Sequence, residues 1–107
     1  MSSITNLIDE SRPLDLICMG RVAVDFYAEQ VHSALEDAQS FRKYLGGCAG
    51  NTAVGTARLG LKSAMFSCVG TDDMGIYLRN TLEKEGVDTS LLRNTPENLT
   101  ALVLLGV

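Results

Sequence analysis

The stretch "LGGCAGNTA", residues 45–53, concentrates the residue types in this chain that could hold a ligand. Its three glycines leave the main chain bare, and Asn51 offers an amide that both donates and accepts hydrogen bonds. Such a bare main chain permits close approach by a phosphate, by a small polar ligand or by a neighbouring segment of the same chain. The residues around it must distinguish these three alternatives.

The two common phosphate-binding motifs are absent from this stretch. A Walker A loop requires Lys followed by Ser or Thr after its glycines, and no such pair follows here. The dinucleotide fingerprint GxGxxG is also missing, because Gly46, Gly47 and Gly50 have a different spacing. A nucleotide-binding domain is therefore disfavoured.

A polyol suits the remaining features better than a phosphate does. Hydroxyl groups need donors and acceptors at fixed positions, which backbone N–H groups at a helix start and the amide of Asn51 would supply. Asp25, which we expect at the end of an adjacent strand, would accept hydrogen bonds from two hydroxyls. The residues alone leave a second interpretation open, in which the glycines form a tight turn, Asn51 is a helix cap and Asp25 is a solvated carboxylate.

The elements that would position these residues alternate between strands and helices. Apolar or alternating runs predict strands at 14–20, 21–28, 63–70, 91–94 and 100–107, of which 14–20 and 63–70 are expected to be buried. Helical spacing and capping residues predict helices at 51–60 and 72–86, the second capped by Asp72 or Asp73 and ended by Gly86. Residues 29–44 carry no core-facing stripe, and they could form a helix or strands that stand away from the core. The order favours an α/β fold with parallel strand pairing.

Length and composition restrict the class of protein. The chain has 107 residues, enough for one small domain, and its 46% hydrophobic and 21% charged residues are typical of a globular protein. The net charge of -4 argues against nucleic acid as a partner, because phosphate backbones are bound by clustered basic residues. No run approaches the roughly 20 apolar residues that span a bilayer, so we expect no membrane partner and a cytoplasmic location.

Few residues suit metal binding or covalent catalysis. Cys18, Cys48 and Cys68 form no CxxC pair, which predicts free thiols and no metal site. Cys48 is the cysteine inside the Gly-rich turn, where a thiol could meet a ligand. The single histidine, His32, lies beside Ser33 without the third member of a catalytic triad, which favours a surface position.

These same residues resemble the ribokinase-like, or pfkB-type, carbohydrate kinase family. The stretches "VGTDDMG" and "EGVDTSLL" resemble the segments that follow the family's first motif, and the similarity extends from Leu14 onward. The first motif itself is matched at Gly46, Gly47, Ala49, Asn51, Ala53, Gly60 and Gly70.

The resemblance implies a fold and a site. The fold is the N-terminal part of a ribokinase-like three-layer α/β sandwich, with a small β-sheet lid formed by about 27–45 and 98–107, behind a flexible leader at 1–13. The residues implied to bind the sugar are Asp25, Gly46, Gly47 and Asn51. Lid strands of this kind often pair between subunits, so the resemblance also implies a homodimer through the lid.

Three stretches, "GRVAVDFYAEQ", "FRKYLGG" and "GTARLGLKSAMFSCVG", are most similar to family members that phosphorylate an acid sugar of inositol breakdown. One departure concerns Ala23, where many members carry Asn, so that one hydroxyl contact is missing or supplied elsewhere. Arg21 could compensate by gripping the sugar carboxylate bidentately. Unchanged sugar affinity in an Arg21→Ala variant would remove this hypothesis.

The family's catalytic motif has no counterpart in this sequence. That motif is a Gly-Ala-Gly-Asp-like turn whose aspartate takes the proton from the sugar hydroxyl, so the resemblance implies no catalytic residue in this chain. It also implies that ATP and Mg²⁺ bind mainly to a C-terminal catalytic part that this chain lacks, and that the 107 residues alone are inactive. We expect the first part of a longer ATP-dependent carbohydrate kinase. The alternative is a truncated, non-catalytic module that binds sugar or dimerises through its lid strands.

Overall fold

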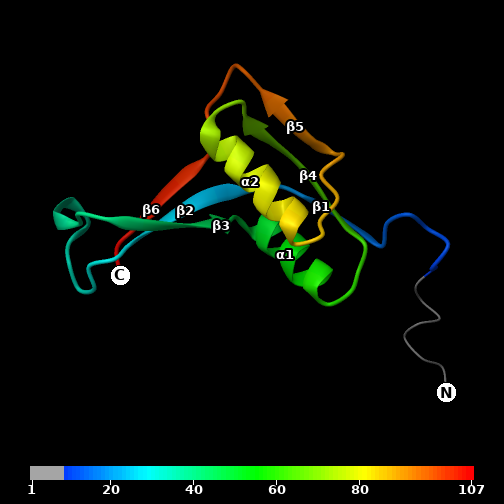
Figure 1. The fold of residues 1–107 in the computed structure, drawn as a ribbon, viewed down its shortest axis with the longest axis horizontal. Coiled ribbons are helices and arrows are strands. Elements are labelled where there is room, and N and C mark those ends of the chain that lie inside the picture. The colour runs from blue at the N-terminus through cyan, green and yellow to red at the C-terminus, as the bar shows by residue number, and fades with distance from the viewer. Residues whose placement is uncertain (1–8) are drawn as a thin grey trace.

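The computed structural model describes residues 9–107, and its elements follow the predicted α/β order (Figure 1). The strands are β1 (Leu16–Met19), β2 (Ala23–Ala28), β3 (Phe41–Gly46), β4 (Ser63–Gly70), β5 (Leu92–Thr95) and β6 (Leu102–Leu105). The helices are α1 (Cys48–Arg58) and α2 (Asp73–Lys84), and residues Leu35–Asp37 form a 3-10 turn. Of the predicted leader at 1–13, residues 1–8 lie outside the described residues. In the described remainder, Lys62 Nζ donates hydrogen bonds to the backbone carbonyls of Glu10 and Arg12.

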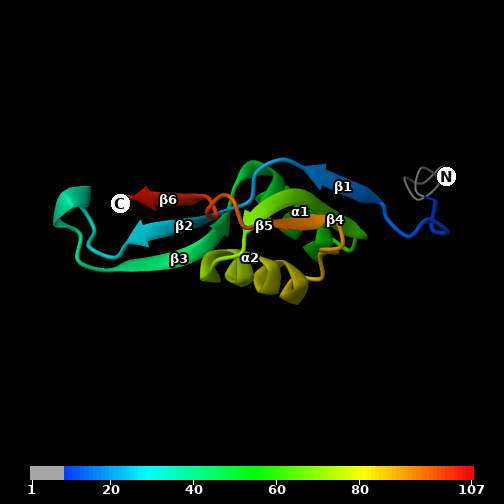
Figure 2. The same cartoon turned by 90° about the horizontal axis from the view of Figure 1, so that it is seen from above.

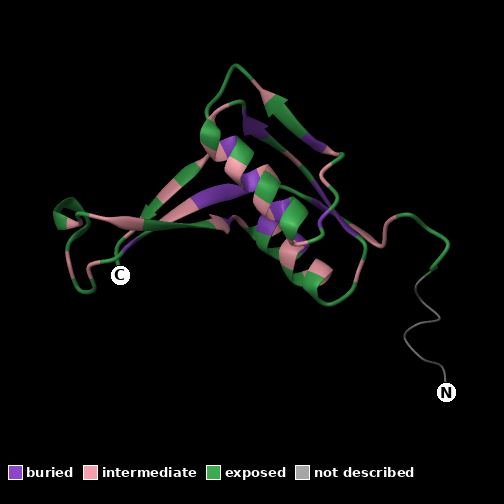
Figure 3. Ribbon diagram, in the orientation of Figure 1, coloured by how far each residue is buried: buried purple, intermediate pink, exposed green. Residues whose placement is uncertain are grey.

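The first sheet is parallel, in the order β1-β4-β5, as predicted for an α/β fold. Its inward residues and those of both helices form one apolar cluster, so α1 and α2 cover the same face. Figure 3 shows the buried positions concentrated on β2, β4 and the inner side of α2. The buried members are Cys18, Val22, Val24, Ala53, Met65, Val69, Leu78, Leu82, Val87 and Leu92.

The opposite face of this sheet is open within residues 9–107. Ile17, Met19 and Phe66 are 50%, 74% and 45% exposed, although the apolar run at 14–20 predicted a buried strand. The prediction of a strand is confirmed, but its burial is wrong for this face, since Cys18 is the one fully buried residue of β1. The physical reason is that both helices of the described chain pack on the side of Cys18 and Met65.

The second sheet has the order β3-β2-β6 and projects from one end of the molecule (Figures 1 and 2). β2 pairs antiparallel with β3 and parallel with β6, which brings residues 102–105 beside residues 24–27. Of the two predictions for residues 29–44, an α-helix is wrong, and a strand that stands away from the core is confirmed only for the end of the segment, in β3, because residues 29–40 form turns and the 3-10 turn. This sheet is built from the segments predicted to form the lid, and its action as a lid stays a prediction.

The helix ends follow capping chemistry, with one shift of boundary. α2 starts after Asp72, whose carboxylate accepts from Gly75 N at 2.9 Å, as one of the two predicted caps. α1 was predicted from Asn51 but begins at Cys48, and Gly60 follows its end at a φ of 98°. No helix within residues 9–107 is long and apolar enough to cross a membrane.

Asp72 also ties the two sheets together. Its Oδ2 accepts from Thr100 N at 2.9 Å, just before β6, and the Thr100 hydroxyl accepts from Gly70 N at 2.9 Å, at the end of β4. The hydrogen bonds that the Asp72 carboxylate accepts lower its pKa from 3.8 to about 2. The largest contribution comes from the Thr100 amide and the next from the Gly75 amide. The ionised carboxylate therefore stabilises the place where the second sheet leaves the first.

We expect Asp72→Asn to lower the thermal unfolding midpoint at pH 7. The asparagine side chain has one acceptor oxygen and one NH₂ group, so it would present a donor to either the Thr100 or the Gly75 N–H. A carboxyl whose pKa is depressed in the folded state stabilises that state above its unfolded pKa, near 4, and this contribution disappears as the pH falls toward 2. The difference in midpoint between wild type and variant should therefore shrink over that interval. Asp73→Asn, one residue along, is the matched control, and an equal effect of both changes would contradict the prediction.

Candidate functional site

An open pocket of about 450 Å³ lies where the second sheet meets the start of α1. It is lined by Asp25, Tyr27, Tyr44, Leu45 and Asn51. Two residues that were predicted to bind a ligand, Asp25 from β2 and Asn51 from α1, thus line one pocket although they are far apart in the sequence.

Asp25 lies inside β2 and not at a strand end, so that part of the prediction is wrong. It pairs with Tyr44 on β3 and with Val103 on β6, because β2 is the central strand of the second sheet. A central strand has neighbours on both sides, which fixes the backbone of Asp25 and leaves only its side chain to move. The carboxylate is therefore presented from the face of a sheet.

The absence of a side chain at Gly46 leaves space for the Asp25 carboxylate. Gly46 pairs with Ala23, so it lies diagonally across from Asp25 on the same face of the sheet. A Cβ built on Gly46 would lie 2.5 Å from Asp25 Oδ1 and still closer to Oδ2, which is closer than real atoms approach. The carboxylate thus occupies the space that a side chain at position 46 would fill.

Gly47 and Gly50 make room for the chain itself. Gly47 has a φ of 89°, and a Cβ there would collide with the backbone carbonyl of Arg21. A Cβ on Gly50 would lie 2.9 Å from Val22 Cγ2, and Gly50 N donates to Arg21 O at 3.2 Å. The expectation that the N–H groups at this helix start are free is therefore wrong for Gly50. The sugar-binding roles predicted for Gly46 and Gly47 stay predictions.

Asn51 is not the cap of α1. The N-cap is Gly47, and Asn51 is the fourth residue of the helix, with its N–H bonded to Gly47 O at 2.8 Å. The capping interpretation of Asn51 is thus wrong, and its amide side chain lines the pocket. This hydrogen bond fixes the main chain of Asn51, which places its side chain in the first turn of α1.

Arg21 is exposed and does not belong to the residues that line the pocket. Its backbone carbonyl accepts from Gly50, so its main chain is fixed against the start of α1. Ala23, where many relatives were expected to carry Asn, is 1% exposed. Neither residue supplies a polar side chain to the lining.

The sequence prediction missed the aromatic wall of the pocket. Tyr27 and Tyr44 meet edge to face, with ring centroids 5.6 Å apart and planes at 78°. Strand alternation from Asp25 would have placed Tyr27 on the same face, but the partner strand and its register were unknown from the sequence. Tyr44 is found only once β3 is paired with β2, opposite Asp25.

The pocket offers hydrogen bonds and aromatic surface, with one negative charge. Asp25 is its charged lining residue, and a carboxylate would repel a triphosphate. Residues 9–107 contain no group of three or more His, Cys, Asp or Glu side chains that could hold a metal ion. A carboxylate, an amide and two tyrosines suit the hydroxyls and C–H faces of a sugar.

Comparison with known proteins agrees with this chemistry. The sequence model described as "pfkB family carbohydrate kinase" matches residues 14–107. A 5-dehydro-2-deoxygluconokinase of Clostridium tetani is 48% identical over 82 residues, which are 77% of this chain and 24% of the relative. The chain therefore spans about a quarter of the length of the curated relatives it matches.

Solved structures of sugar kinases share the fold. An uncharacterized sugar kinase of Pyrococcus horikoshii, in complex with ATP, superposes with a TM-score of 0.82 at 35% identity, covering 85% of this chain and 30% of that one. A fructokinase of Halothermothrix orenii superposes with a TM-score of 0.81 at 30% identity, covering 87% of this chain and 34% of that one. With the family match over residues 14–107 and the ribokinase-like fold, the chain belongs to the pfkB family of carbohydrate kinases.

Proposed function

We propose that this chain is the sugar-binding, lid-bearing N-terminal part of an ATP-dependent carbohydrate kinase that acts on 5-dehydro-2-deoxygluconate. The reaction would transfer the γ-phosphoryl group of ATP to a primary hydroxyl of this acid sugar. The observation that carries the proposal is the meeting of Asp25 and Asn51 in one pocket, with Gly46 making space for the carboxylate.

The substrate is proposed from the relatives and from the chemistry of the pocket. The relatives of Clostridium tetani and Geobacillus thermodenitrificans are named for the phosphorylation of this sugar, at 48% and 42% identity. The substrate's hydroxyl and keto groups suit the mixed donors and acceptors of Asn51, and its hydroxyls suit the acceptor Asp25. A ketose or a nucleoside would share some of these contacts, so both belong among the ligands that are compared.

In the proposed reaction, the residues of this chain bind and orient the sugar. Asp25 would accept hydrogen bonds from two hydroxyls, and Asn51 would donate to one oxygen and accept from another. Tyr27 and Tyr44 would cover the C–H face of the sugar and exclude water, which is a competing phosphoryl acceptor. Holding the primary hydroxyl in a fixed position is the chain's contribution to the rate.

ATP and Mg²⁺ are assigned to parts of a full-length kinase that this chain does not span. The Pyrococcus horikoshii kinase was crystallised with ATP, which supports the nucleotide for a member of this family. When bound, nucleotide and metal would supply the phosphoryl group and the positive charge that stabilises its transfer. Closure of the second sheet over the sugar is the lid movement that we propose to accompany binding.

The test is a panel of candidate sugars with ATP and Mg²⁺, assayed on the full-length protein for ADP release. The panel holds 5-dehydro-2-deoxygluconate, fructose, ribose and a nucleoside. A kcat/KM for the deoxyketo acid well above all others supports the proposal. Preference for another sugar would overturn the assignment of the substrate, and turnover of none would overturn the assignment of kinase activity.

Lid-mediated association is a second property that we propose, on the basis of the exposed apolar side of β6. Leu102 and Leu104 are 48% and 52% exposed, and β6 pairs on one side only within the described chain. An unprotected apolar edge strand readily pairs with another chain. We expect sedimentation to show a dimer that Leu104→Asp weakens, whereas Leu59→Asp, at an 85% exposed position after α1, should not. A wild-type monomer at all concentrations would contradict this.

A further inference from the structure

The pocket face of the second sheet continues beyond its lining to Arg42. The β2-β3 register pairs Asp25 with Tyr44 and Tyr27 with Arg42. Directly paired residues lie on the same face of a sheet, and residues two apart in a strand share that face. Arg42 therefore stands on the side of Asp25, directly opposite Tyr27 and two residues along β3 from Tyr44.

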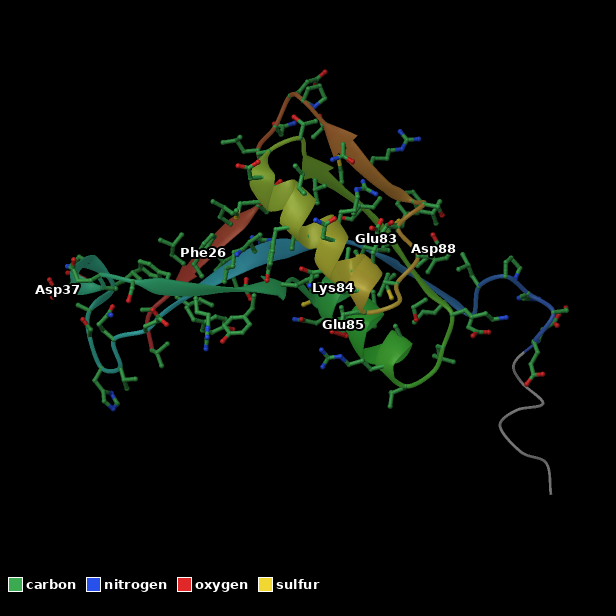
Figure 4. All side chains as sticks on the ribbon, viewed as in Figure 1. Phe26, Asp37, Glu83, Lys84, Glu85 and Asp88 are labelled. Atoms are coloured by element: carbon green, nitrogen blue, oxygen red, sulfur yellow. The ribbon has the colours of Figure 1, made fainter. Side chains whose placement is uncertain are left out.

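The neighbouring cation of β3 lies on the other face. Lys43 pairs with Phe26, and its Nζ lies 4.5 Å from the centre of the Tyr77 ring of α2. Figure 4 shows Phe26 on the second sheet, away from the acidic residues Glu83, Glu85 and Asp88 near the end of α2. Lys43 thus has an aromatic partner, whereas Arg42 is exposed and forms no hydrogen bond or ion pair within residues 9–107.

The separation between Asp25 and Arg42 suits the two ends of an acid sugar. Two residues along a strand span about 7 Å, so Asp25 and Arg42 occupy one face of the sheet at positions roughly that far apart. A six-carbon acid sugar bound by its hydroxyls at Asp25 has to direct its own carboxylate away from that like charge. Along the sheet face, the next pair after Asp25 and Tyr44 is Tyr27 and Arg42.

We propose that Arg42 binds the carboxylate of the substrate and thereby selects acid sugars over neutral ones. A guanidinium holds a carboxylate through two parallel hydrogen bonds, which gives strength and a fixed orientation. This role was predicted from the sequence for Arg21. Neither arginine is among the residues that line the pocket, but Arg42 is paired within the sheet on the pocket face, whereas Arg21 precedes β2. The inference rests on the proposed function, because it needs an acid sugar in the pocket.

The experiment compares two ligands that differ only at the carboxylate. They are 5-dehydro-2-deoxygluconate and the neutral ketose in which a hydroxymethyl group replaces the carboxylate, and their affinities are measured by calorimetry. Loss of one charge-assisted, bidentate contact should weaken binding of the acid about 10- to 100-fold in Arg42→Ala. Binding of the neutral ketose should change less than about 3-fold, because it makes no such contact.

Three variants separate the alternatives. Lys43→Ala removes a cation from the same strand on the opposite face and should leave both affinities unchanged. Arg21→Ala tests the earlier candidate. If Arg42→Ala keeps the preference for the acid, or if Arg21→Ala alone loses it, the inference about Arg42 is overturned. If wild type binds neither ligand, the proposed function itself fails, which is a different outcome.

Discussion

Replacing Asp25 with Asn is expected to weaken sugar binding about 100-fold while leaving the fold intact. The change keeps the shape of the side chain but removes the charge that strengthens hydrogen bonds from two hydroxyls, each worth about 1.5 to 3 kcal/mol when one partner is ionised. Asp25 is anchored on both sides by β3 and β6, so no backbone adjustment can bring another acceptor into its place. Calorimetry with 5-dehydro-2-deoxygluconate measures the loss.

The matched control for this change is Asp37→Asn. Asp37 is an acidic residue near the far tip of the same sheet, in the 3-10 turn, and it is labelled there in Figure 4. The control alters net charge by the same amount without touching the pocket. Equal affinities in wild type and Asp25→Asn would show that the carboxylate does not meet the sugar.

Adding one methyl group at Gly46 is expected to have a comparably large effect. The Cβ of Gly46→Ala would overlap the Asp25 carboxylate, which lies at the end of a side chain and can move away at little cost in stability. Gly46 needs no left-handed backbone conformation, so alanine is tolerated by the strand. We therefore expect sugar affinity to fall about 100-fold, as in Asp25→Asn, while the unfolding midpoint changes little.

Gly55→Ala is the control for Gly46→Ala. A Cβ at Gly55 meets nothing within 4 Å, and alanine inside α1 should stabilise the helix by up to about 1 kcal/mol. Sugar affinity should be unchanged in this variant.

If Gly46→Ala binds sugar with the affinity of wild type, the Asp25 carboxylate that it displaces has no part in sugar recognition. The double variant Gly46→Ala/Asp25→Asn should lose little more than either single one, because both remove the same contact.

Local patterns in the sequence predicted most of the first sheet and its helices. β4 has the predicted bounds of 63–70, because an apolar run closed by glycine is read correctly without knowledge of its neighbours. Asp72 and Gly86 delimit α2 through capping chemistry that acts within a few residues. Such features are determined by the segment itself, which is why they could be predicted.

The features that could not be predicted depend on which strands are neighbours. Tyr44 joins the pocket only because β3 pairs with β2 in the register that places it opposite Asp25. The start of α1 was predicted three residues too late, because Asn51 resembles a cap, whereas the backbone of Gly47 against Arg21 begins the helix earlier. The open face at Ile17 and Met19 likewise depends on what packs there, which an apolar run does not specify.

A crystal structure with 5-dehydro-2-deoxygluconate bound tests the central claim most directly, because it locates the sugar and every contact at once. We predict sugar hydroxyls within hydrogen-bond distance of the Asp25 carboxylate and the Asn51 amide, with the rings of Tyr27 and Tyr44 beside the carbon chain. Sugar density at another place, with this pocket vacant or filled by the protein's own side chains, would contradict the account.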